Sequence, residues 1–242
     1  MPSVTTMVTL VNTAEGLQDA CEALKGKSPI VIDLEGSNLG RRGSVTMLQV
    51  AVSPEQVYCF DVMQMGDFAF QMLKPLLEDI SIVKLCYDCR CDADALLHLH
   101  GIYLRGVYDL QILFTLLFQA SSDPYLKGLY HALQMPHIIE HEIRDEVLSR
   151  KRECKRMMQT ASGRLLFAQR PVPPYILEYC ALDVVFLFNM YNQWRHYRDE
   201  ARLMRMSERR MQDYCFTRLP SDPRIMSCVD FVRIECDVSV FG

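Results

Sequence analysis

Short apolar runs separated by turn residues occupy the first third of the chain, and their lengths predict β-strands. The runs cover residues 7–11, 29–34, 45–52, 56–60 and 82–86. The turn sequence Gly-Arg-Arg-Gly-Ser at 40–44 favours a three-stranded meander made of the second, third and fourth runs. Asn12 with Glu15 predicts a capped helix that runs to Leu24 and ends at Gly26. A second helix is predicted over 68–77, where Pro75 should break or bend it.

The rest of the chain is predicted to be helical. Leucines recur at helical spacing after Asp92, and no convincing strand is found between there and about Tyr197. Strands mixed with helices predict an α/β fold in which a mixed sheet is covered by helices on both faces. We expect one domain over residues 1–200 and a C-terminal extension over 201–242.

Two segments depart from this pattern. Residues 140–174 are rich in Lys and Arg and close with Pro-Val-Pro-Pro, which predicts an excursion from the core. Residues 229–241 alternate between apolar and polar positions, which favours an edge strand or a partner-binding segment. The C-terminal extension is therefore expected either to pack on the domain or to contact a partner, such as a second copy of the chain.

Composition excludes several classes of protein. Half of the 242 residues are hydrophobic, which argues against disorder, and a net charge of −4 lacks the basic signature of a protein that coats nucleic acid. No apolar run reaches the roughly 18 residues that span a bilayer, so no membrane association is expected. The ten cysteines are scattered through a mid-sized chain, which predicts reduced thiols and an intracellular compartment, either nucleus or cytoplasm.

The first candidate chemistry lies at the end of the run Ile-Val-Ile-Asp-Leu-Glu-Gly. Asp33 and Glu35 are two residues apart, so a strand would point both side chains to the same face. Two buried carboxylates cost several kcal/mol unless a cation compensates them. The alternative is that the strand simply ends here and that water solvates both acids.

The second candidate is Asp92, which follows the strand predicted over 82–86. An acid at the start of a helix is ordinarily a cap, and Asp88 and Asp94 are rivals nearby. The residues alone therefore do not select Asp92 for a metal or catalytic role.

The third candidate is the pair Tyr179 and Asp183 in a helix that begins near Pro174. A spacing of four residues places the phenol and the carboxylate on one helical face. The alternative is a buried structural tyrosine hydrogen-bonded to an acid. Taken together, the three candidates supply four carboxylates, which suits two Mg²⁺ or Mn²⁺ ions and phosphodiester hydrolysis.

These residues resemble the three motifs of the DEDDy branch of 3′–5′ exonucleases, a group of the ribonuclease-H-like superfamily that includes RNase D. The motifs are Asp33-x-Glu35, Asp92 and Tyr179-x-x-x-Asp183, and the segments 87–96, 101–104, 107–111 and 170–184 are similar to Egalitarian-type members. The resemblance covers roughly residues 5–200. It implies a DnaQ-like exonuclease fold and selects Asp92 over its neighbours.

The resemblance also implies roles for the five residues. Asp33 would bridge two metal ions, Glu35 and Asp183 would complete the site of the first ion, and Asp92 would hold the second. Tyr179 would orient the attacking water. The implied substrate is single-stranded RNA, with DNA as an alternative. Because some Egalitarian-type relatives are inactive RNA-binding adaptors, a non-catalytic scaffold is the competing function.

Several other motifs are expected to be structural. The spacing of Cys86, Cys89 and Cys91 is only part of a zinc pattern, and His98 and His100 fall on different helical faces. Asp109 precedes a helical run and is expected to cap it. The basic stretch 144–170 and the arginines near the C-terminus have two possible roles, phosphate contact or a solvated helix face. The latter group comprises Arg195, Arg198, Arg202, Arg205, Arg209 and Arg210.

Overall fold

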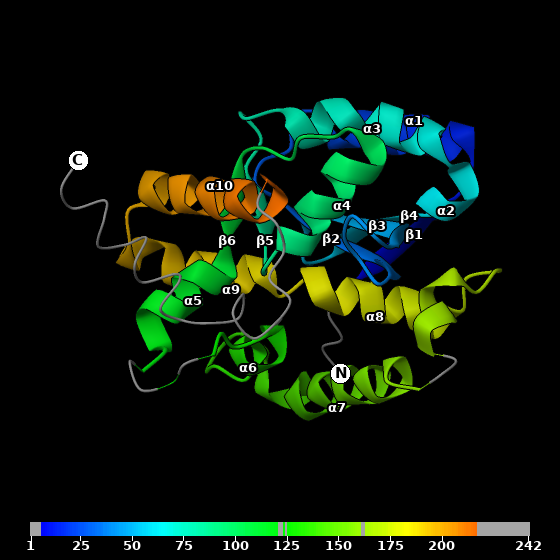
Figure 1. The fold of residues 1–242 in the computed structure, drawn as a ribbon. Helices are drawn as coiled ribbons and strands as arrows, with labels where there is room; N and C mark the ends of the chain where they lie inside the picture. Colours follow the sequence, from blue (N-terminus) through cyan, green and yellow to red (C-terminus); the bar gives the residue numbers. More distant parts are fainter. Residues whose placement is uncertain (1–5, 121–122, 124, 161–162, 217–242) are drawn as a thin grey trace.

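A six-stranded mixed sheet forms the centre of the molecule (Figure 1). The computed structural model describes residues 6–120, 123, 125–160 and 163–216. The strand order is β1 (Met7–Val11), β4 (Gln56–Phe60), β3 (Ser44–Ser53), β2 (Ile30–Ser37), β5 (Lys84–Cys86) and β6 (Val107–Asp109). Strand β3 runs antiparallel to both β2 and β4, and the remaining pairs are parallel. The predicted meander β2–β3–β4 and the α/β class are therefore confirmed.

Helices cover both faces of this sheet, as the sequence predicts. On one face lie α1 (Ala14–Leu24), α3 (Asp67–Glu78) and α4 (Arg90–His100), and the short α2 (Val62–Met65) precedes α3. On the other lie α5 (Leu110–Phe118), α8 (Pro174–Val184) and α9 (Leu187–Trp194), with α7 (His141–Met158) packed outside α8 (Figure 1). The chain also contains α6 (Leu129–Leu133), η1 (Gly163–Ala168), η2 (Arg195–Tyr197) and α10 (Glu200–Phe216). Each face of the sheet has its own hydrophobic core.

Two local predictions are wrong, the cap residue of the first helix and the absence of a strand after Asp92, whereas for Pro75 only the predicted break is wrong and the bend stays a prediction. Thr13, not Asn12, caps α1, because its side-chain oxygen accepts a hydrogen bond from the Gly16 amide at 3.1 Å. Pro75 does not end α3, which continues to Glu78 with buried leucines on either side of the proline. The region after Asp92 does contain a strand, β6, whose three residues are too few to show an alternating pattern.

The basic segment packs back on the core instead of leaving it. Helix α7 contacts α8, and η1 contacts β2 and β3. Arg170 forms an ion pair with Asp61 at 2.5 Å, which ties the end of this segment to the start of α2. The excursion predicted over 140–174 is therefore a covering layer over one face of the sheet.

The part of the predicted C-terminal extension that the structure describes is helix α10. It packs along β6 and α4, and its apolar residues enter both hydrophobic cores (Figure 1). The strand or partner segment predicted over 229–241 lies outside the described residues. Eight of the cysteines lie within them, and each is a free thiol. Among the helices described, none combines the length and apolarity needed to cross a bilayer.

Candidate active site

Strand β2 presents Asp33 and Glu35 to the face of the sheet that α8 covers. The intervening Leu34 belongs to the core on the opposite face, as the alternation of side chains along a strand requires. A bulge follows Glu35, where the register with β3 shifts at Gly36. A Cβ atom on Gly36 would lie 1.9 Å from the Ser44 carbonyl oxygen, so the close approach of β3 requires glycine here. The sequence thus fixes the backbone beside the two acids.

Helix α8 brings the second part of the site over β2. It begins at Pro174, a proline at the first helical position, and it carries Tyr179 and Asp183 one turn apart. Carboxylate oxygens of Asp33, Glu35 and Asp183 all lie within 4.8 Å of one another. Acids 150 positions apart in the chain therefore converge at one point of the sheet.

Asp92 lies in the first turn of α4, which follows β5. Because β5 is the parallel neighbour of β2, the C-terminal ends of both strands lead to the same edge. Asp92 is only 7% exposed and lies outside the close group of three acids, although its charge still raises the pKa of Asp33. It does not cap α4, whose N-cap residue is Cys89.

The structure separates Asp92 from its two rivals. Asp94 forms an ion pair with Arg41 at 2.6 Å, and Asp88 forms one with Arg90 at 2.6 Å. Asp92 makes no ion pair within the described parts of the chain. Of the three acids near the start of α4, Asp92 is therefore the one whose carboxylate remains available to a cation.

Burial and mutual repulsion dominate the electrostatics of these acids. Burial, and then the charge of Asp183, raises the pKa of Asp33 well above its usual range, and burial with the charge of Asp33 does the same for Glu35. Burial and the charge of Asp88 raise the pKa of Asp92 to about 8. In addition, one side-chain oxygen of Asp183 is buried without a hydrogen-bond partner. This concentration of carboxylates fits a divalent cation with hard oxygen ligands, such as Mg²⁺ or Mn²⁺.

The phenol of Tyr179 faces the same environment. Burial, and then the charge of Asp183, raises its pKa above the ordinary value, so the group stays protonated at neutral pH. The ring of Phe167 packs against it with centroids 5.9 Å apart. Tyr179 can therefore donate a hydrogen bond beside the acids but cannot serve as a strong base.

A buried lysine of the basic stretch completes the site, although phosphate contact or a solvated helix face was predicted for that stretch. Lys151 of α7 is 7% exposed, its ammonium contacts a carboxylate oxygen of Asp183, and the same nitrogen lies 4.3 Å from the centre of the Tyr179 ring. A signal for this placement was present in the sequence. Lys151 is four residues after Val147 and three before Cys154, so it lies on the buried face of the helix.

The remaining motifs have structural partners. Asp109 caps α5, as expected, because its side chain accepts a hydrogen bond from the Gln111 amide at 2.9 Å. His98 lies beside the carbonyl oxygen of Cys215, whereas the His100 ring stacks on Phe70. Arg210 fits neither role expected for the C-terminal arginines, because it is 1% exposed and forms an ion pair in the interior.

A family described as 3′–5′ exonuclease matches residues 8–196. The piRNA biogenesis protein EXD1 of Mus musculus and that of Homo sapiens are each 32% identical over 165 residues. The aligned part is 68% of this chain but only 28% and 32% of the two relatives, so the chain spans about a third of their length.

Solved structures show the same fold. The complex of Trypanosoma brucei RNase D with GMP superimposes with a TM-score of 0.77 at 23% identity, over 95% of this chain and 71% of that one. Escherichia coli RNase D gives a TM-score of 0.56 at 20% identity, over 84% of this chain and 51% of its own. The match over residues 8–196 and the 32% identity to the EXD1 proteins over 68% of this chain show that the chain belongs to the 3′–5′ exonuclease family.

Proposed function

We propose that this chain removes nucleotides from the 3′ end of single-stranded RNA and releases nucleoside 5′-monophosphates. The observation that carries the proposal is the convergence of Asp33, Glu35 and Asp183 within 4.8 Å, with Asp92 buried at the adjoining strand end. Buried acids at such spacing suit metal-assisted phosphodiester hydrolysis.

Each side chain has a separate role in this proposal. Asp33, Glu35 and Asp183 would hold one divalent ion, and Asp33 with Asp92 would hold a second. Ions bound there would lower the pKa of a water molecule and stabilise the charge that develops on the leaving 3′ oxygen. The protonated phenol of Tyr179 would orient the attacking water toward the terminal phosphodiester.

The choice of RNA over DNA rests on the relatives. Trypanosoma brucei RNase D has been solved in complex with RNA U12, with a TM-score of 0.73 to this chain, and the sequence relatives are named for piRNA biogenesis. Lys151 favours a second candidate, a non-catalytic RNA-binding subunit, because its ammonium already contacts a carboxylate oxygen of Asp183 that a metal would need.

The test is an assay on 5′-labelled single-stranded RNA and on DNA of the same sequence, with Mg²⁺, Mn²⁺ or EDTA. We expect a ladder of shortened RNA in either metal and none in EDTA. Asp33→Asn should abolish the ladder, whereas Asp145→Asn, at an exposed position on α7, should leave it unchanged. RNA that is bound but never shortened in either metal would establish the non-catalytic candidate, and preferential shortening of the DNA would refute RNA as the substrate.

A further inference from the structure

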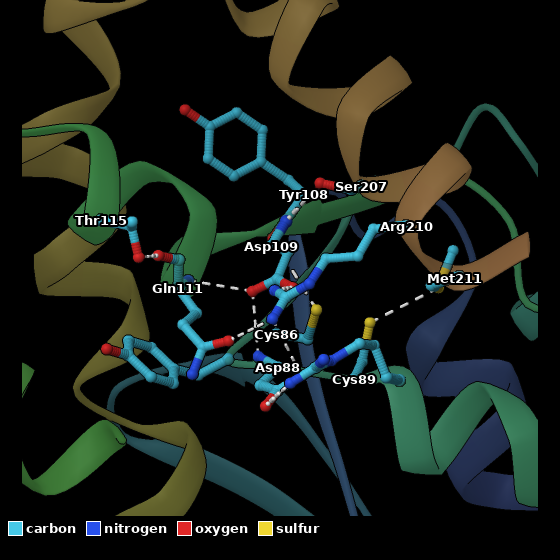
Figure 2. Close-up of polar contacts among 12 residues, drawn as sticks. Cys86, Asp88, Cys89, Tyr108, Asp109, Gln111, Thr115, Ser207, Arg210 and Met211 are labelled. Atoms are coloured by element: carbon cyan, nitrogen blue, oxygen red, sulfur yellow. Dashed lines mark hydrogen bonds and ion pairs between the residues drawn. The ribbon is translucent and has the colours of Figure 1, made fainter. Parts of the chain in front are cut away.

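Helix α10 inserts a buried arginine beside the end of β6. The Arg210 side chain donates to a carboxylate oxygen of Asp109 at 2.7 Å and to the side-chain oxygen of Gln111 at 2.6 Å (Figure 2). On the same helix, the Ser207 hydroxyl accepts a hydrogen bond from the Asp109 amide at 2.9 Å. A fully buried arginine is costly unless its charge is paired, so this contact constrains how α10 sits against the sheet.

This network extends to the turn that leads into α4. The second carboxylate oxygen of Asp109 accepts the amide of Asp88 at 2.9 Å, and Arg210 lies 3.5 Å from the Asp88 carboxylate. Asp88 has a φ of +63°, an unfavourable conformation for a residue with a side chain. Figure 2 shows Asp88 below Asp109, with Arg210 reaching toward both. Asp109 and Arg210 therefore contact this turn, together with Arg90, which pairs with the Asp88 carboxylate at 2.6 Å.

That turn determines where Asp92 lies. Helix α4 begins at Arg90, two residues after Asp88, and Asp92 lies in its first turn. Asp92 does not belong to the close group of Asp33, Glu35 and Asp183. Because it lies in the first turn of α4, its distance from Asp33 depends on where that helix begins.

A second link joins α10 to the other acid-bearing element. Arg41, in the turn between β2 and β3, donates to the carbonyl oxygens of Tyr214 and Cys215 at 2.9 and 3.0 Å. The same side chain forms the ion pair with Asp94 on α4. Helix α10 thus contacts both the hairpin that carries Asp33 and the helix that carries Asp92.

The alternative interpretation of this cluster of side chains is a metal-binding site. Cys86, Cys89 and Asp109 offer ligand atoms within 4.8 Å of one another. However, the two carboxylate oxygens of Asp109 already accept bonds from Arg210 and from two backbone amides. Burial also raises the pKa of the Cys86 thiol, which disfavours the thiolate that a metal requires. Asp109 therefore binds the Arg210 side chain and not a metal ion.

We propose that Arg210 is a positioning residue, which sets the distance between Asp92 and Asp33 through Asp109 and the Asp88 turn and thereby tunes the affinity for the second metal ion. The proposal rests on the metal site of the proposed function. It adds a residue beyond the region 8–196 that matches the exonuclease family. Partners that orient a ligand indirectly typically change metal affinity by about ten-fold or more when removed.

The test measures Mn²⁺ binding by calorimetry without RNA, together with hydrogen exchange at residues 88–92. Arg210→Met should weaken one Mn²⁺ site about ten-fold and accelerate exchange in this turn, and Arg210→Lys should give a smaller change. The matched control is Arg209→Met, whose side chain is 59% exposed on the same helix and which should behave as wild type. Excess Mn²⁺ should restore RNA shortening by Arg210→Met toward the wild-type rate.

The outcomes separate this proposal from the nuclease itself. If Arg210→Met does not fold, Arg210→Lys and Ser207→Ala decide the matter, because each weakens the network with less loss of packing. Folded variants with wild-type Mn²⁺ affinity and wild-type exchange overturn the positioning role, whether or not RNA is degraded. If these variants weaken Mn²⁺ binding but the wild-type protein leaves RNA intact, only the proposed nuclease activity is refuted.

Discussion

Lys151 is a cation that the chain itself places among the catalytic candidates. Its ammonium contacts Asp183 and lies over the ring of Tyr179, so it offsets part of the charge that Asp33 and Glu35 add. A divalent ion that binds Asp183 must compete with this ammonium. Metal affinity is therefore a balance between the attraction of several acids and the loss of an internal ion pair.

The acids should make the metal-free protein less stable as the pH rises. The pKa of Asp92 rises from 3.8 to about 8 on folding, so between these values the folded state holds a proton that the unfolded chain has lost. The free energy of unfolding then falls with increasing pH across this interval. The raised pKa values of Asp33 and Glu35 act in the same direction.

This prediction is checked by urea unfolding in EDTA at about pH 5 and about pH 8. The stability should be lower at the higher pH, and Asp92→Asn should reduce the difference. Added Mn²⁺ should restore stability at the higher pH, because it binds the deprotonated acids. A metal-free protein that becomes more stable over the same interval would contradict the raised pKa values of these carboxyls.

The bulge between β2 and β3 gives a prediction at the level of elements. In Gly36→Ala the new methyl group would overlap the Ser44 carbonyl oxygen, so the hairpin must open beside Glu35. We expect a loss of about 2 kcal/mol in the free energy of unfolding, together with reduced RNA shortening. Gly128→Ala is the matched control, because nothing lies within 4 Å of its added Cβ atom. Equal stability of the two variants in urea would contradict this account of the bulge.

Local sequence patterns predicted the elements that carry the acids, but not the contacts between distant elements. Asp33 and Glu35 follow from the two-residue period of a strand, and Tyr179 with Asp183 from the helical period. Strand β6 was not predicted because its three residues are too few to show an alternating pattern. The helical period places Lys151 on the buried face of α7, but the sequence does not identify its distant partner Asp183, nor Asp109 as the partner of Arg210. The remaining contacts of the site join residues about 30 to 100 positions apart, and they depend on packing that local patterns do not encode.

At the scale of the whole molecule, α10 links the two hydrophobic cores. Leu203 belongs to the core on the α8 face, whereas Met211 belongs to the core on the α1 face. A helix shared in this way favours cooperative unfolding of both layers. Trp194, 3% exposed in the first of these cores, provides a fluorescence probe.

We therefore predict that Leu203→Ala destabilises the entire domain. The side chain is 1% exposed, and its truncation should cost about 3 kcal/mol. The urea midpoints followed by Trp194 fluorescence and by far-ultraviolet circular dichroism should fall together. Separate midpoints, with only the fluorescence shifted, would mean that the two layers unfold independently.

The position of α10 along the chain has a consequence for biosynthesis. The ribosome makes all six strands before it makes Arg210, the residue that neutralises Asp109 at the edge of the sheet. A nascent chain that has not yet extruded α10 carries an unpaired carboxylate and an uncovered β6, and both oppose closure of the domain. Closure of the domain is therefore expected to wait until α10 has left the ribosome, and the proposed hydrolytic activity should arise only after that step.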